Sequence, residues 1–160
     1  MEPLSVAAGV IALTQAAVGI GKGIRFLQSL KDVPVEYKDL LDELSNLHLI
    51  TDHIQAVLKQ FQSIKPSKLD SKLRLARVEC GIITSLTDDL SKVTNDLNDL
   101  CDRLKKTPRR VYEDGQPRHQ RVSKYEWQKE KRSLDMLRSK ARTTREFLTL
   151  CFSVLTSSSR

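Results

Sequence analysis

The chain is poor in the residues that build sheets, turns and disulfide frameworks. Aromatic residues make up only 5% of its 160 residues, and it has only six glycines and five prolines. Because strands favour aromatic and β-branched residues, this composition disfavours a β-sandwich or barrel. Three cysteines, Cys80, Cys101 and Cys151, are too few and odd in number for a disulfide framework. The composition therefore indicates an all-α domain in a reducing, intracellular setting.

The motifs of nucleotide-binding enzymes and metalloproteases are also absent. The sequence has no GxxxxGK[ST], GxGxxG or HExxH pattern. Residues 19–23, GIGKG, are rich in glycine but lack the preceding strand and the Lys-Ser/Thr pair of a phosphate-binding loop. His48 and His53 are five residues apart, so on a helix they point to different faces and cannot easily share a metal. We therefore expect no enzyme, no catalytic residue, no metal site and no cofactor.

Length and composition fit one domain with its own core. A chain of 160 residues, 39% hydrophobic and 29% charged, is long enough to bury a core without disulfides or metals. These fractions also exclude a disordered chain and a polytopic membrane protein. We expect a single domain over residues 1–157 and a frayed tail over residues 158–160.

Proline and apolar spacing predict four long helices. The prolines stand at Pro3, Pro34, Pro66, Pro108 and Pro117. Proline is tolerated at the start of a helix and disfavoured inside it, so these positions read as boundaries. Apolar residues recur every three or four positions over residues 37–64 and 69–104, and a similar stripe with a gap between Trp127 and Leu134 runs over residues 127–155, which is typical of amphipathic helices. We predict an antiparallel bundle of about four long helices, because each apolar stripe needs a partner and short connections favour antiparallel neighbours.

The last helix has a clear start and is preceded by a basic loop. Ser123 and Glu126 form an S-x-x-E capping box, which predicts a helix beginning there. Residues 107–122 interrupt the helical pattern with two prolines and an Asp-Gly turn signal at 114–115. This segment is expected to be a loop with a short β-ribbon around the turn.

Positive charge concentrates in and around that loop. The net charge is +7, but residues 1–102 carry 11 Lys/Arg against 14 Asp/Glu, whereas residues 103–132 carry 11 against 4. Such a segment is either a solvated loop or a patch for an anionic partner. No helix-turn-helix or zinc-finger pattern accompanies it, so we expect no nucleic acid and instead an anionic membrane surface. The candidate lipid-binding residues are Arg109, Arg110, Arg118, Arg121 and Lys124.

The first helix is nearly free of charge. Residues 3–21 contain no charged side chain, and such a helix is about 28 Å long, close to the ~30 Å of a bilayer core. Glu2 and the lack of a basic residue before it disfavour a signal peptide. The many Ala and Gly residues, with Thr14 and Gln15, disfavour a permanent transmembrane anchor. Because the helix is apolar on all sides, we expect it either to lie innermost in the bundle or to lie in lipid. A helix that is buried at rest and can leave to enter a bilayer would do both.

Two sets of residues in this helix have candidate roles. The side chains expected to enter the membrane are Leu4, Val6, Val10, Ile11, Leu13, Val18 and Ile20. A ridge of small residues suited to close helix packing comprises Ala8, Ala12, Ala16, Gly19 and Gly23. A glycine in a helix costs up to ~1 kcal/mol relative to Ala, so its presence here indicates close packing or a conformational change.

The opening of the chain resembles a known family. Residues 1–16, MEPLSVAAGVIALTQA, resemble the fungal N-terminal domain of STAND proteins, a HeLo-like family. Residues 26–34, FLQSLKDVP, and residues 40–44, LLDEL, fit the same pattern, as does the late helix around Trp127. The resemblance spans most of the chain and is strongest over residues 1–44.

This resemblance implies a cell-death effector domain. It implies a helical bundle at the N-terminus of a fungal immune-type receptor, active in regulated cell death and heterokaryon incompatibility. A nucleotide-binding NACHT or NB-ARC region usually follows such a domain. The implied mechanism is exposure of residues 4–20, homo-oligomerisation and permeabilisation of membranes, with relocation from the cytoplasm to the plasma membrane on activation. The alternative is a non-lytic self-association or adaptor module that recruits a signalling partner.

Overall fold

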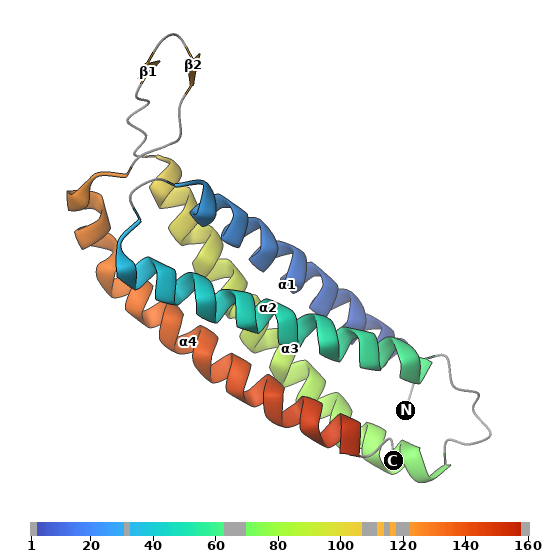
Figure 1. Ribbon diagram of the computed structural model, residues 1–160. Helices are drawn as coiled ribbons and strands as arrows, with labels where there is room; N and C mark the ends of the chain where they lie inside the picture. The colour runs from blue at the N-terminus through green and yellow to red at the C-terminus, as the bar shows by residue number, and fades with distance from the viewer. Residues whose placement is uncertain are drawn as a thin grey trace.

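The protein is a bundle of long helices. The computed structural model describes residues 3–30, 33–62, 70–106, 112–113, 116–117 and 122–157. The described elements are α1 (Pro3–Ser29), α2 (Val35–Gln62), α3 (Asp70–Lys105), β1 (Tyr112–Glu113), β2 (Gln116–Pro117) and α4 (Lys124–Ser157). The helices lie side by side along one long axis, and the β-ribbon stands beyond one end (Figure 1). The prediction of an all-α bundle with four long helices is confirmed.

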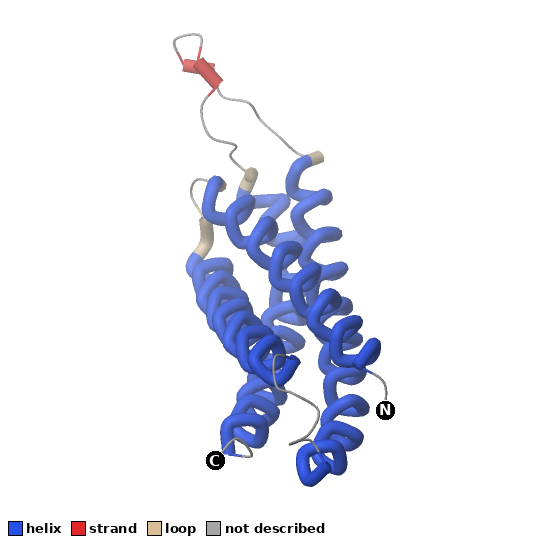
Figure 2. The backbone as a smooth tube through the Cα atoms, turned by 90° about the vertical axis from the view of Figure 1, so that its right-hand side faces the viewer, coloured by secondary structure: helices blue, strands red, loops and turns tan. Residues whose placement is uncertain are grey.

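The helices occupy the corners of a square in an unexpected order. α1 packs against α2 and α3, and α4 packs against the same two helices, so α1 and α4 lie on one diagonal. Successive helices alternate in direction (Figures 1 and 2). Neighbours are therefore antiparallel for α1 with α2 and for α3 with α4, but parallel for α1 with α3 and for α2 with α4. The short connections thus fix the alternation of direction but not which helices become neighbours.

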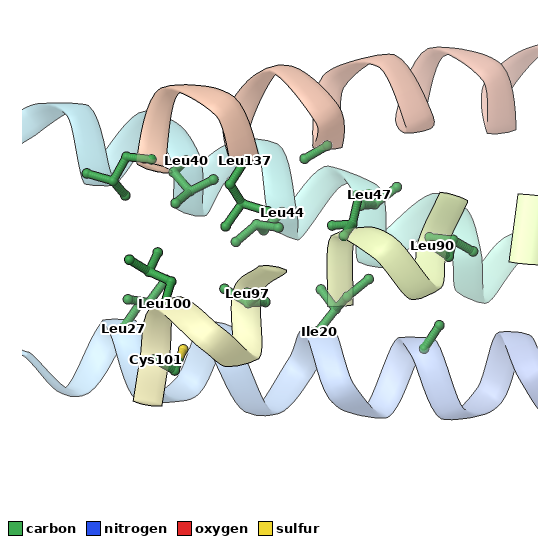
Figure 3. Close-up of a cluster of buried hydrophobic side chains, with 14 of the residues drawn as sticks. Ile20, Leu27, Leu40, Leu44, Leu47, Leu90, Leu97, Leu100, Cys101 and Leu137 are labelled. Atoms are coloured by element: carbon green, nitrogen blue, oxygen red, sulfur yellow. The ribbon is translucent and has the colours of Figure 1, made fainter. Parts of the chain in front are cut away.

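The predicted stripes form the core. The largest side chains with almost no exposure are Leu13, Ile20 and Leu27 of α1; Tyr37, Leu40, Leu44, Leu47 and Ile54 of α2; and Leu86, Leu90, Leu97 and Leu100 of α3. Leu134, Leu137 and Leu148 of α4 are also buried. Figure 3 shows several of these side chains converging from all four helices. Burying such residues stabilises the fold by about 1.5–3 kcal/mol each.

Local signals at the loop are also confirmed. The hydroxyl of Ser123 accepts a hydrogen bond from the backbone N–H of Glu126 at 3.3 Å, and the Ser123 carbonyl accepts one from Trp127 at 3.1 Å. Ser123 is therefore the N-cap of α4. The predicted ribbon is present as an antiparallel pair with Tyr112 opposite Pro117.

The expectation that the first helix lies innermost is wrong. α1 occupies a corner, with neighbours on two sides and solvent beyond them. Ile11 is 57% exposed and Val18 is 48% exposed. In a four-helix square every helix has one outward face, so a helix that is apolar all round must leave part of its apolar surface in water.

Candidate functional site

The candidate membrane-entering residues of α1 divide between two faces. Val10, Leu13 and Ile20 are buried against the other helices, whereas Ile11 and Val18 point outward. Leu4 and Val6 belong to the first turns of α1, but their side chains lie outside the described residues. Of the predicted membrane-entering side chains named here, only Val10, Leu13 and Ile20 pack in the core of the bundle at rest.

α1 has the length and composition of a membrane span. The stretch Ala8–Ser29 is long and apolar enough to cross a bilayer, and 39% of its most apolar 18-residue window is buried inside the bundle. A core helix of a water-soluble protein or a signal sequence has the same length and composition. A buried share of this size is ordinary for a helix at the corner of a four-helix bundle, which always has one outward face. Its two charges, Lys22 and Arg25, lie toward its C-terminal end.

The small ridge meets α3 at its two glycines. A Cβ placed on Gly19 would lie 2.5 Å from Cγ2 of Thr94, and one placed on Gly23 would lie 2.6 Å from Cγ of Leu97. Ala16 is buried, Ala12 is half-buried and Ala8 is exposed. The packing role predicted for this ridge therefore applies from residue 16 onward, where the backbones of α1 and α3 come close.

Alanine substitutions at two nearby glycines should have opposite effects. Gly23→Ala should destabilise the fold by about 1–3 kcal/mol, because the new methyl overlaps Leu97 in a packed core. Gly21→Ala should instead stabilise it by up to ~1 kcal/mol through helix propensity, because the new methyl meets only movable side chains, the His48 ring at 3.3 Å and the Arg25 guanidinium at 3.9 Å. Thermal unfolding of both variants measures this, and equal shifts would contradict the packing described for Gly23.

Few polar contacts tie α1 to its neighbours. The Gln55 side-chain amide donates a hydrogen bond to the hydroxyl of Thr14, and the ammonium of Lys105 lies 5.0 Å from the centre of the Phe26 ring. Among the residues that the structure describes, α1 makes no ion pair with another helix. Apolar packing against α2 and α3 is therefore its main attachment.

Ion pairs connect the other three helices. The cross-helix pairs are Asp39–Arg138, Glu43–Arg142 and Glu43–Arg145 between α2 and α4, and Asp96–Lys140 and Arg103–Glu130 between α3 and α4. The carboxylates of Glu43 and Glu130 are buried, and Arg103 Nε lies 3.0 and 3.1 Å from the two oxygens of Glu130. α2, α3 and α4 therefore form one unit held by charge as well as by packing.

Neither buried glutamate, Glu43 nor Glu130, was predicted from the sequence. Glu130 lies three residues after Trp127 and four before Leu134, so it occupies a position of the apolar stripe. A charged residue in such a stripe is a detectable signal of a buried ion pair. Glu43 gives no such signal, because its partners Arg142 and Arg145 lie about 100 residues later.

Most of the predicted basic patch lies outside the described residues. Arg109, Arg110, Arg118 and Arg121 all belong to the undescribed part of the loop. Lys124 is the first residue of α4 and is exposed. The structure therefore places one residue of this patch, at the end of the bundle where α4 begins.

The titratable groups with raised pKa values belong to the core. Burial raises the pKa of the Cys101 thiol to about 11 and also raises the pKa of Cys151. Burial and the nearby Glu130 carboxylate raise the pKa of Tyr37, whose ring meets that of Trp127 edge to face. The buried thiols of Cys101 and Cys151 are therefore protonated at neutral pH and behave as small apolar groups. Within the described ranges, no three His, Cys, Asp or Glu side chains lie close enough to hold a metal.

Comparison with known proteins identifies no relative. No protein-family model, no curated protein and no solved structure matches the chain. The resemblance of residues 1–44 to HeLo-like domains therefore stays a prediction. Function has to be inferred from the position of α1, the contacts of the other helices and the distribution of charge.

Proposed function

We propose that this domain is a non-enzymatic effector that permeabilises membranes. In this proposal α1 leaves the bundle, enters the bilayer and acts as part of a homo-oligomer, as in the N-terminal domain of a fungal STAND receptor. The observation that supports it most is the unequal attachment of the helices. α1 is held mainly by apolar contacts, whereas α2, α3 and α4 are joined by five ion pairs among the described residues.

Apolar attachment favours transfer to lipid over transfer to water. Val10, Leu13 and Ile20 are buried in the bundle and would be buried again among acyl chains. Ile11 and Val18, which face water at rest, would become buried as well, and burial of such a side chain contributes about 1.5–3 kcal/mol. No ion pair described for α1 has to break, so the electrostatic penalty of leaving is small.

The charges of α1 are compatible with insertion. Lys22 and Arg25 lie near its C-terminal end, where long basic side chains can extend to the headgroups. Departure of α1 would also uncover the apolar faces of α2 and α3 that it covers at rest. Large exposed apolar patches promote association, so release and oligomerisation are coupled in this proposal.

Leakage of a trapped dye from anionic vesicles tests the proposal. The double variant Ile11→Glu/Val18→Glu should require a protein dose at least ~100-fold higher, because each charge near the centre of a membrane helix costs about 2.5–3.5 kcal/mol. Both residues are about half exposed at rest, so the variant should fold normally. Circular dichroism and thermal unfolding verify that it does.

A matched control separates insertion from general surface effects. Leu49 on α2 and Leu150 on α4 are 55% and 66% exposed, close to the values for the α1 pair. Leu49→Glu/Leu150→Glu should therefore leak like the wild type. If both double variants leak equally, or if the wild type never leaks and only self-associates in light scattering, a non-lytic adaptor role is the better account.

A further inference from the structure

α4 carries the largest surplus of positive charge among the four helices. Lys124–Ser157 contains eight Lys/Arg and four Asp/Glu, whereas Val35–Gln62 of α2 contains two against five. The cations in the second half of α4, Arg138, Lys140, Arg142 and Arg145, pair with carboxylates of α2 and α3. That half of the helix therefore uses its positive charge within the bundle.

The first half of α4 presents its positive charge to solvent. Lys124, Lys129, Lys131 and Arg132 are exposed, and none forms an ion pair with another residue in the described part of the chain. These four cations follow directly on residues 107–121, which add four arginines against two acidic residues.

Two large apolar side chains share this surface. Tyr125 is 72% exposed and Met136 is 53% exposed. Tyr125, Lys129, Arg132 and Met136 follow one another at spacings of four, three and four residues, which places them along one face of the helix. Around this line lies a shallow hollow formed only by α4 side chains, with Asp135 as its acidic member.

We propose that this basic face of α4, comprising Lys124, Tyr125, Lys129, Lys131, Arg132 and Met136, docks on an anionic lipid surface. The proposal deepens the membrane function above, on which it rests, by naming the surface that makes first contact. Lysines complement lipid phosphates, while a tyrosine and a methionine beside them suit the boundary between headgroups and acyl chains. No helix-turn-helix or zinc-finger pattern accompanies these cations, which favours a lipid surface over a nucleic acid as the partner.

The position of α4 gives this docking a consequence. α1 and α4 occupy opposite corners of the bundle, and their backbones do not meet anywhere in the described part of the chain. Docking through α4 therefore leaves the outward face of α1, with Ile11 and Val18, turned away from the lipid. Recruitment and insertion are then two separate steps, and binding to a membrane does not by itself expose α1 to it.

Vesicle sedimentation tests the docking surface. The triple variant Lys129→Gln/Lys131→Gln/Arg132→Gln should bind phosphatidylserine-containing vesicles ~100-fold more weakly than wild type, because each cation near such a surface contributes about fivefold. The matched control Lys38→Gln/Lys59→Gln/Lys92→Gln removes the same charge from exposed positions on α2 and α3 and should lose less than about fivefold. Binding of the wild type should also weaken as salt is raised.

The alternative outcomes overturn the docking surface. Equal losses in the two triple variants would show that net charge, and not α4, governs binding. Failure of the wild type to sediment with anionic vesicles, or binding of a single-stranded oligonucleotide through α4 instead, would assign the face to another partner or to none. If the wild type binds through α4 but never releases dye, docking stands and the permeabilising function falls. The α4 triple variant can also be anchored to nickel-chelating lipids through a histidine tag. If the anchored variant then releases dye from the vesicles, both proposals stand.

Discussion

A disulfide between cysteines at positions 19 and 94 should abolish leakage, and a reductant should restore it. The Cβ position of Gly19 lies 3.9 Å from Cβ of Thr94, within the 3.5–4.5 Å range typical of disulfides. Gly19→Cys/Thr94→Cys would therefore tie α1 to α3 at a point where the two helices pack closely. Since the proposed mechanism requires these helices to separate, the oxidised protein should release no dye at doses where the reduced protein empties the vesicles.

Several controls accompany the disulfide variant. Cys80, Cys101 and Cys151 are replaced by Ala, so that only the new pair can form a disulfide. The single variant Gly19→Cys in the same background reports any damage from the added side chain next to Thr94. Oxidation should leave vesicle binding through α4 unchanged, because that surface lies on the opposite corner. Leakage by the fully oxidised protein would mean that α1 acts without leaving α3, contrary to the proposed function.

Removing Arg103 should destabilise the bundle by about 1–3 kcal/mol, because its guanidinium is 45% exposed and water screens part of the attraction. The side chain of Glu130 is 8% exposed, and without the guanidinium of Arg103 its carboxylate would remain buried and unpaired. For a chain of this size such a loss lowers the melting temperature of Arg103→Ala by about 3–10 °C. Differential scanning calorimetry at neutral pH measures the shift.

The paired substitution shows whether the ion pair itself is responsible. Arg103→Met/Glu130→Met removes both charges and keeps similar side-chain volume, so it should recover most of the lost stability. A small shift for Arg103→Ala, or an equal loss in the double variant, would show that the Arg103–Glu130 pair contributes little to joining α3 to α4. The three-helix unit that remains when α1 leaves would then lack one of its main supports.

The helices and the core follow from the sequence because they depend on local patterns. A spacing of three and four residues places Leu40, Leu44 and Leu47 on one face, and nothing distant is needed to bury them. The start of α4 is equally local, since Ser123 caps the helix that immediately follows it. For these elements, periodicity and capping contain most of the information.

The choice of neighbours does not follow from the sequence. An apolar stripe requires a partner but does not specify which one, so the α1–α4 diagonal was not predicted. The outward position of Ile11 depends on that choice, because a corner helix exposes one face and a central helix exposes none. The same holds for Glu43, whose burial depends on Arg142 and Arg145 from the far end of the chain.

The most direct test follows α1 itself during the reaction. A polarity-sensitive fluorophore on Val18→Cys, near the middle of the stretch Ala8–Ser29, reports whether that helix enters lipid. A second protein with the label on Leu49→Cys of α2, also exposed at rest, serves as the reference. When anionic vesicles leak, we expect quenchers in the acyl chains to reach the label at position 18 but not the one at position 49. If position 18 stays accessible to a water-soluble quencher while the vesicles empty, α1 is not the element that enters the membrane.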